Sequence, residues 1–302
     1  MGLRSFMVKI LPNPLIKVFA APYVAGDSEE SAVETARWLW RKRRICSTID
    51  MLGEDVETRE GVQECLNSYH TVVDMLGRQE FATVSLKPTQ FGTHISRDEC
   101  EKNIASVIEK ARENDLKITI DMEDHRYTSL TLEIYKSLLE RFPGLGVVLQ
   151  SRLHRTENDI KGLKGTEARV RICIGIYNEP PEVALQDRTD MKRKLLEYAE
   201  MLFLDGHYVE FATHDEEVVE KALVLTDRLG IKKDGFEFQM LMGVPRTYLQ
   251  HKLVESGHVV RLYVPYAKKW ADAVAYARRR LAANPKMMTF GIKNFFKKLS
   301  GG

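Results

Sequence analysis

The sequence lacks the features that mark several large classes of protein. Its four cysteines form no Cys-x-x-Cys pair and do not cluster with histidines, which argues against a zinc site or a disulfide framework and for reduced thiols in the cytoplasm. The 45 basic residues nearly balance the 43 acidic ones, so no nucleic-acid partner is indicated. No apolar run reaches the roughly 18 residues of a membrane-spanning helix. The Gly-x-Gly-x-x-Gly motif of open dinucleotide-binding sheets is also missing.

What the sequence has instead is a regular alternation of short apolar runs and longer segments of helical period. The runs predicted as strands are Ile45–Met51, Ala82–Leu86, Lys117–Ile120, Gly146–Leu149, Val170–Ile174, Val209–Ala212, Phe236–Met240 and Val259–Val264. The helical segments between them include 59–76, 97–113, 129–140, 188–203, 216–229 and 245–256. Eight strands that alternate with helices favour an α/β fold, a closed (βα)8 barrel of the TIM type, over an open doubly wound sheet.

The chain is predicted to be a single domain over residues 1–302, because no low-complexity linker divides it. Residues 1–44 form an N-terminal helical arm with a helix over Ala32–Arg43, residues 45–285 the barrel and its final helix, and residues 286–302 a basic tail. The arm lacks a clean apolar core, so a cleaved signal is not expected. An arm that covers the barrel is favoured over one that touches a membrane surface, and a frayed end is favoured for the tail.

Polar and ionisable residues gather at the predicted strand ends, where a barrel of this kind builds its site. They are Lys87, Asp121, Glu123, Asp124, Gln150, Arg152, Arg171, Tyr177, Thr213, His214, Asp215, Glu237, Gln239 and Tyr263. Taken singly, each has a plainer interpretation: Lys87 is a surface lysine, Asp121 a helix N-cap, or His214 a structural histidine. Their recurrence from strand to strand favours a functional site at this rim of the barrel.

The last predicted helix, Trp270–Ala282, carries three consecutive arginines. Its period places Tyr276, Arg279 and Arg280 on one face and turns Arg278 elsewhere. Two guanidiniums beside a phenol make a clamp for a carboxylate. Cations near a helix end are also favoured by the helix dipole, so a structural role stays open on this ground alone.

Nine short segments, each weakly specific alone, carry a further signal through their order. They are DMLGE (50–54), SLKPTQFG (85–92), IDMED (120–124), VVLQSRL (147–153), RICIGIY (171–177), FATHD (211–215), FEFQMLMG (236–243), RLYVPY (261–266) and YARRRLAANP (276–285). Together they resemble the proline dehydrogenases, flavoenzymes with a distorted (βα)8 barrel. The resemblance extends from about Ile45 to Pro285 and so covers most of the chain.

The resemblance implies an activity: FAD-dependent oxidation of L-proline to 1-pyrroline-5-carboxylate, by hydride transfer from proline C5 to the flavin N5. This is the first step of proline catabolism to glutamate, and in the family a quinone in the membrane reoxidises the flavin. The expected partners are therefore L-proline or a close analogue and a quinone. The expected location is the cytoplasm, with peripheral contact at the inner face of the membrane left open.

The resemblance also implies roles for individual residues. The substrate site matches Lys87, Asp121, Tyr263, Tyr276, Arg279 and Arg280, and the pocket wall matches Tyr177 and Leu241. The FAD-contacting positions match Gln150, Arg171, Gly175, Thr213, His214 and Glu237, and no metal is implied. Within this set, Arg279 and Arg280 would bind the substrate carboxylate, Lys87 and Asp121 would form an ion pair, and Arg171 would reach the flavin N5 edge.

The chain departs from the family pattern at four places: Ile174 stands where lysine is usual, Ile176 for alanine, Ala267 for glycine and Ala283 for glutamate. One alternative is therefore a divergent flavoenzyme that oxidises a related cyclic or N-alkyl amino acid. A second is a barrel lyase that uses Lys87 as a Schiff base, and a third is a barrel that binds an amino acid without catalysis. The pairing of Lys87 with Asp121 would keep the lysine charged and so disfavours the lyase.

Overall fold

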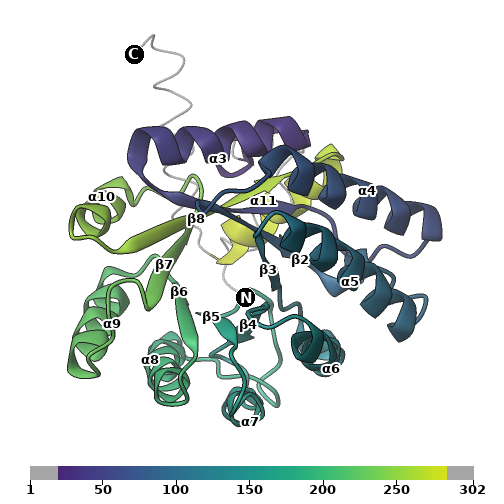
Figure 1. The fold of residues 1–302 in the computed structure, drawn as a ribbon. Helices are drawn as coiled ribbons and strands as arrows, with labels where there is room; N and C mark the ends of the chain where they lie inside the picture. Colours follow the sequence, from purple (N-terminus) through teal and green to yellow (C-terminus); the bar gives the residue numbers. More distant parts are fainter. Residues whose placement is uncertain (1–19, 284–302) are drawn as a thin grey trace.

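A closed barrel of eight parallel strands organises the protein in the computed structural model, which describes residues 20–283. Each strand pairs with the next along the chain, and the last closes on the first (Figure 1). The strands are β1 Cys46–Met51, β2 Ala82–Leu86, β3 Lys117–Ile120, β4 Gly146–Gln150, β5 Arg169–Cys173, β6 Tyr208–Ala212, β7 Phe236–Leu241 and β8 Val259–Tyr266. The predicted (βα)8 barrel is confirmed, with β8 extending two residues beyond its predicted end.

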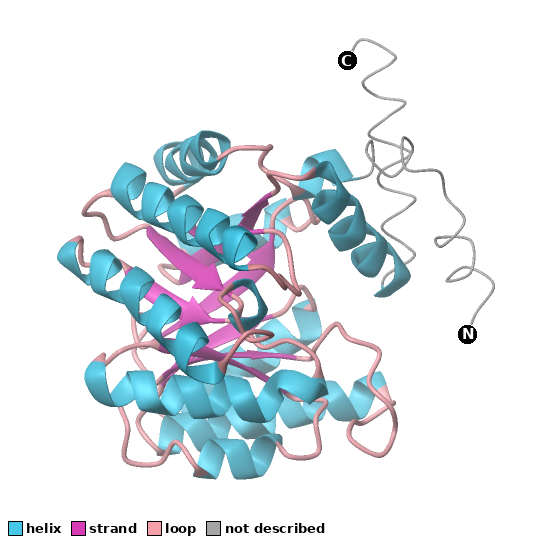
Figure 2. Ribbon diagram, turned by 90° about the vertical axis from the view of Figure 1, so that its right-hand side faces the viewer, coloured by secondary structure: helices cyan, strands magenta, loops and turns pink. Residues whose placement is uncertain are grey.

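Helices surround the strands on the outside, as the side view in Figure 2 shows. The helices of this ring are α3 Glu29–Arg43, α4 Arg59–Leu76, α5 Arg97–Glu113, α6 His125–Arg141, α7 Thr156–Lys161, α8 Arg188–Leu204, α9 Glu216–Arg228 and α10 Thr247–Glu255. The chain also forms α11 Trp270–Ala283 and the short 3-10 turns η1 Ala21–Tyr23 and η2 Pro88–Gln90. Most match the predicted segments, but α7 was not predicted because its six residues are too few to show a helical period. No helix within residues 20–283 is long and apolar enough to cross a membrane.

The helix before the barrel takes an unexpected place in the outer ring. In a regular (βα)8 barrel the helix after the eighth strand packs between the first and the last. Here α3 packs there, against β1, β8 and α4, while α11 lies inside the outline of the ring (Figure 1). This part of the predicted covering arm is therefore a ring helix, and the final helix is left free to approach the site. Residues 20–28 of the arm, which include η1, are also described, whereas residues 1–19 and the basic tail lie outside the described residues.

Side chains on the outer face of the strands form the apolar core with the helices. Phe211, Phe236 and Phe238 are all buried, and their ring centroids lie 5.6–6.1 Å apart. The alternation of strand residues sends the other set inward. That inner set is polar, so the barrel interior is filled by paired charges instead of the branched apolar layers common in such barrels.

The interior charges form an unbroken chain of contacts. Arg261 binds Glu237 with two N–H···O bonds of 2.6 and 3.0 Å, and Gln239 donates to both Glu237 and Glu210 at 2.6 Å. Glu210 is in turn paired with Arg169 and lies 3.6 Å from Arg171. Burial alone would raise the pKa of Glu237, but Arg261 and Arg169 lower it to about 2. The charge of Glu237 in the barrel interior is therefore maintained by the two arginines.

This pairing makes a prediction about stability. Arg261→Met keeps most of the side-chain volume but leaves Glu237 buried without its cation, which costs about 3–5 kcal/mol. Urea unfolding at neutral pH should report that loss, and the double variant Arg261→Met with Glu237→Gln should recover part of it. A single variant as stable as the parent would show that the barrel does not depend on the pair.

Candidate functional site

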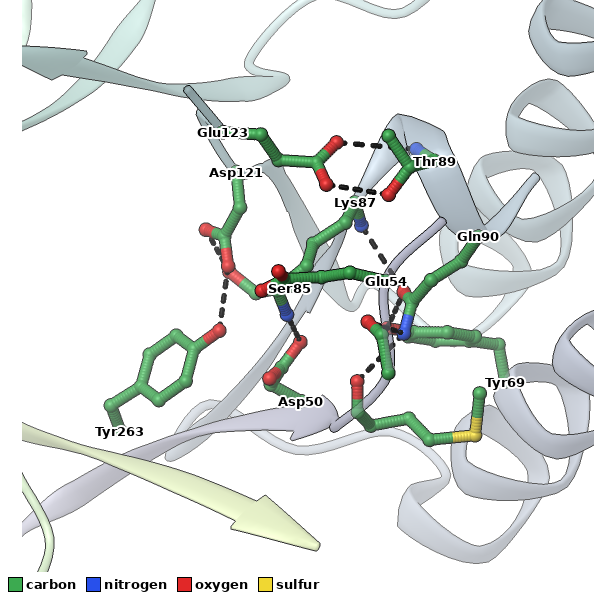
Figure 3. A network of polar contacts seen from close by, with 12 residues as sticks. Asp50, Glu54, Tyr69, Ser85, Lys87, Thr89, Gln90, Asp121, Glu123 and Tyr263 are labelled. Carbon is green, nitrogen blue, oxygen red and sulfur yellow. Dashed lines mark hydrogen bonds and ion pairs between the residues drawn. The ribbon is translucent and has the colours of Figure 1, made fainter. Parts of the chain in front are cut away.

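Charged side chains meet where β1, β2 and β3 end. Lys87, directly after β2, places its Nζ 2.5 Å from Oδ1 of Asp50 on β1 (Figure 3). Both side chains are buried. Burial would lower the pKa of Lys87, but the nearby carboxylates of Asp50, Asp121 and Glu54 raise it above its ordinary value. Lys87 is therefore an ammonium group, which is the wrong state for a Schiff-base nucleophile.

The prediction that Lys87 pairs directly with Asp121 is wrong, because Lys87 pairs with Asp50 and Asp121 pairs with Arg171. Asp121 accepts hydrogen bonds from Arg171 at 2.6 Å, from the Tyr263 hydroxyl at 2.6 Å and from Ser85 at 2.9 Å. These donors come from β5, β8 and β2, so one carboxylate ties together three strands. The plainer interpretation of Asp121 as a helix N-cap is also wrong, because Asp124 caps α6 instead.

The phenol and guanidinium groups beside Asp121 are packed on one another. The Arg171 guanidinium lies 5.5 Å from the centre of the Tyr263 ring. Burial and the charges of Asp121 and Asp50 raise the pKa of Tyr263 well above 10, so it stays a neutral donor. Arg171 and Tyr263 thus fix Asp121 from two sides at the point where the barrel interior meets the mouth.

The arginine-bearing helix α11 lies over this network. Arg279 Nη2 is 2.8 Å from Glu54 Oε1, in the loop between β1 and α4. Arg280 lies 5.0 Å from the centre of the Tyr276 ring, and the phenols of Tyr276 and Tyr263 raise its pKa although burial opposes the charge. The two guanidiniums therefore lie near residues of the network, as expected of a clamp at this mouth.

Two further groups at the predicted site are the phenol of Tyr177, which follows β5, and the imidazole of His214, which follows β6. Burial, Glu54 and Glu123 raise the pKa of Tyr177, so its phenol stays protonated. His214 Nε2 accepts a hydrogen bond of 2.8 Å from the backbone N–H of Leu241. Burial, helped by Arg280 and Arg246, lowers the pKa of His214 to about 4. His214 is thus a neutral imidazole with its proton on Nδ1.

The ends of β4 and β5 fit an edge of a flat, hydrogen-bonding ring. Gln150 donates from Nε2 to the carbonyl of Glu123 at 2.8 Å, while its buried Oε1 has no hydrogen-bond partner within the described residues. Gly175 lies against that oxygen with φ of 101°, and a Cβ there would come within 2.3 Å of it. A buried acceptor left open beside a position that only glycine can fill is suited to a ring N–H, such as that of a flavin.

Thr213 and Glu237, two of the expected cofactor residues, lie at opposite ends of their strands. Thr213, after β6, is buried, and its Oγ1 accepts from the backbone N–H of Asp215 at 3.1 Å. Glu237 is the second residue of β7 and points into the barrel, where Arg261 and Gln239 occupy its carboxylate. The structure therefore does not bring Glu237 to the mouth, because Glu237 stands near the start of β7 and its carboxylate is turned into the barrel.

Two residues at the mouth, Asp50 and Glu54, were missed by the sequence reasoning even though both lie in the DMLGE segment. Asp50 lies within β1, whereas the sequence reasoning considered the polar residues at and after the ends of the later strands. Glu54 lies in a loop, where an acidic residue is ordinary. Their importance comes from their partners, Lys87 and Arg279, which lie 37 and 225 residues away in the sequence.

Within residues 20–283, Glu123 is a carboxyl at this mouth that forms no ion pair with a basic side chain. It accepts hydrogen bonds from the Thr89 hydroxyl at 2.5 Å and from the Thr89 backbone N–H at 3.2 Å. Burial raises its pKa to about 7, although these hydrogen bonds and the charge of Lys87 act in the other direction. Glu123 therefore titrates close to neutrality.

Comparisons with known proteins identify relatives over nearly the whole chain. Residues 32–176 and 189–291 match the sequence model described as proline dehydrogenase. Proline dehydrogenase 2 of Bacillus subtilis (strain 168) is 34% identical over 299 residues, which are 97% of this chain and 96% of that protein. Proline dehydrogenase of Deinococcus radiodurans is 32% identical over 284 residues, covering 92% of this chain and 90% of that protein.

The fold also has counterparts among solved structures. Proline utilization A from Bdellovibrio bacteriovorus, inactivated by N-propargylglycine, superimposes with a TM-score of 0.79 at 23% identity. The match covers 87% of this chain and 32% of that longer one. A Bradyrhizobium japonicum proline utilization A variant gives a TM-score of 0.72 at 20% identity, covering 86% of this chain and 30% of that one.

The titration of Glu123 gives a prediction on pH. A carboxyl whose pKa is raised in the folded protein retains its proton longer there than in the unfolded chain, so stability falls as pH rises from about 4.5 towards 7. Glu123→Gln mimics the protonated group and should stabilise the protein by roughly 1–3 kcal/mol at pH 8 but little at pH 4.5. Denaturant unfolding at both pH values measures the difference. An equal effect at both would mean that Glu123 does not titrate in this range.

Proposed function

We propose, on the premise that this chain belongs to the proline dehydrogenase family and oxidises proline with FAD, that the substrate binds between α11 and the carboxyl ends of β1, β2, β3 and β8. One observation carries the proposal: two guanidiniums of α11 lie over a buried network of charges and phenols. That network comprises Lys87, Asp50, Asp121 and Tyr263. Proline is a zwitterion, so its site needs cations for the carboxylate and an apolar wall for the ring.

The substrate carboxylate would bind to Arg279 and Arg280. Arg279 is about a third exposed, and its recorded ion pair is with the single carboxylate of Glu54, so part of its donor fork remains open to a ligand. Arg280 has its positive charge stabilised by phenols, which do not neutralise it. A second carboxylate is therefore electrostatically favoured beside the pair. Leu241 and Tyr177 would provide the wall against the ring.

Lys87 would act on the charge state of the substrate amine. A protonated amine has no lone pair to form the C=N bond of the product, so the reactive substrate has a neutral nitrogen. The ammonium of Lys87, held charged by Asp50, disfavours a second ammonium nearby. It cannot itself accept the amine proton while charged. Its part is then electrostatic, together with the Asp121 and Tyr263 pair that fixes the floor of the site.

The flavin would lie against the ends of β4, β5 and β6. Gln150, Gly175, Thr213 and His214 would hold it, and Arg171 would approach it from the barrel interior. When bound, FAD supplies the hydride acceptor for the carbon next to the substrate amine. Gln150 would accept from a ring N–H, and His214 would donate from Nδ1, the nitrogen left protonated by its contact with Leu241.

The electron acceptor and the location of the protein are proposed from the family alone. A quinone would reoxidise the flavin, and the enzyme would act in the cytoplasm with peripheral contact at the inner face of the membrane. The single-domain organisation rests on the one barrel that residues 20–283 build.

The substrate range is open to test, because Ile174 and Ile176 are bulkier or less polar than the family pattern at these positions. Ile174 is half-buried and packs against the main core, so it contributes packing in place of a charge. The purified yellow protein should bleach when L-proline is added without oxygen. Pipecolate and sarcosine, a larger ring and an N-alkyl amino acid, are the comparison substrates. Bleaching by one of these but not by L-proline would overturn the substrate; a protein that takes up no FAD would overturn the proposal.

The arginine clamp makes a second prediction. Arg279→Met and Arg280→Met should each raise KM for L-proline while the protein stays yellow, since losing one partner of such a charge pair costs about 2–5 kcal/mol. Steady-state kinetics and the flavin spectrum are the measurements. Arg193→Met, on the outer face of α8 and in contact with Asp190 and Glu197, is the matched control. Normal KM in both α11 variants would mean that the carboxylate binds elsewhere.

A further inference from the structure

Glu54, the partner of Arg279, lies in a loop with an uncommon backbone. The residue before it, Gly53, has φ of 137°, and the residue after it, Asp55, has φ of 54°. Both values fall in the left-handed half of backbone space, which residues other than glycine rarely adopt. A loop with two such residues in three positions holds one shape only where its surroundings fix it. The contacts that fix it therefore decide where the Glu54 carboxylate lies.

One set of these contacts comes from the side chain of Gln90, in the η2 turn directly after Lys87. Gln90 Nε2 donates to the carbonyl of Met51 at 2.8 Å and to that of Gly53 at 3.1 Å. Its Oε1 accepts from the Tyr69 hydroxyl at 2.8 Å, which fixes the orientation of the amide. Gln90 is fully buried. It thus holds the loop on the N-terminal side of Glu54.

A second set comes from Thr89, the neighbouring residue, and holds the C-terminal side. The Thr89 hydroxyl accepts a hydrogen bond of 3.1 Å from the backbone N–H of Asp55. The backbone carbonyl of Thr89 accepts one of 2.9 Å from the backbone N–H of Val56. The same hydroxyl donates to Glu123 at the end of β3 (Figure 3). One oxygen atom therefore links the buried carboxyl of Glu123 to the backbone beside Glu54.

We propose that Thr89 and Gln90, with Glu123 behind them, are positioning residues that set where Glu54 meets Arg279 and so control the affinity for the substrate carboxylate. The inference rests on the proposed role of Arg279 in binding that carboxylate. The direction of the hydrogen bonds supports it, because they end on the backbone of residues 51, 53, 55 and 56, on both sides of Glu54. Three of the four, residues 53, 55 and 56, lie beyond the end of β1, whose ladders with β2 and β8 end at residues 50 and 51.

The test uses a matched pair at Thr89 in the FAD-loaded enzyme. Thr89→Val keeps the shape but removes the hydroxyl, which leaves the Asp55 N–H and Glu123 without this partner. It should raise KM for L-proline about fivefold, the effect of one lost hydrogen bond, with kcat changed less than about twofold. Thr89→Ser keeps the hydroxyl and should behave as the parent. Thermal unfolding and flavin content confirm that each variant is folded; Gln90→Met serves in place of Thr89→Val if that variant loses its flavin.

A double-mutant cycle with Glu54→Gln separates positioning from a general packing effect. If Thr89 acts through Glu54, Thr89→Val should leave KM nearly unchanged once Glu54→Gln is present, because the ion pair it positions is already lost. The same rise in KM in both backgrounds, or no rise in either, would overturn the proposal. Arg279→Met is measured alongside. If it leaves KM unchanged, the carboxylate assignment fails; if it raises KM while the cycle is additive, only the positioning role fails.

Discussion

The ion pair between Arg171 and Asp121 is the interaction on which the site depends. It joins the charged interior of the barrel to its mouth, because Arg171 lies 3.6 Å from Glu210 on one side and 2.6 Å from Asp121 on the other. Buried charges are stable only when paired, and removing one partner leaves the rest of the chain of contacts uncompensated. An apolar residue at the position of Arg171 would leave the Asp121 carboxylate without this cation and the Tyr263 ring without the guanidinium packed on it.

The placement of α11 depends on a second constraint, the packing of α3. A barrel must cover the outer apolar faces of β1 and β8, and α3 does so with Ala32, Val33, Ala36 and Leu39, all buried. Because α3, which precedes β1 in the sequence, occupies that position, the helix after β8 has no place in the ring. It lies instead over the mouth, where Arg279 reaches Glu54. A helix upstream of the barrel therefore makes the arginine clamp possible.

Much of this architecture could be predicted from the sequence, for physical reasons that also explain the failures. The alternation of apolar runs with helical segments predicts the barrel, and the i, i+3, i+4 spacing predicts that Arg279 and Arg280 share the face of Tyr276. The partner of Lys87 could not be predicted, because it depends on the stagger of neighbouring strands. Asp50 lies opposite Ser85 in the ladder, so Lys87, two residues on, extends back over Asp50 while Asp121 is taken by Arg171. The spacing of residues along the sequence does not specify how β1 and β2 are aligned with each other.

The Glu54 and Arg279 pair follows from the cost of keeping a substrate site charged without its substrate. A clamp for a carboxylate must hold guanidiniums at a half-buried mouth, where an unpaired cation is poorly solvated. Glu54 provides a carboxylate of the same chemistry as the proposed ligand, at 2.8 Å, so the cation is already desolvated and paired before proline arrives. If Glu54 were held loosely, the cost of ordering it would fall on each binding event. The backbone around Glu54 is instead ordered when the protein folds, because Thr89 and Gln90 fix it from both sides. The entropy of ordering this loop is then not lost at each binding event, so the shape of one short loop affects the affinity of the site.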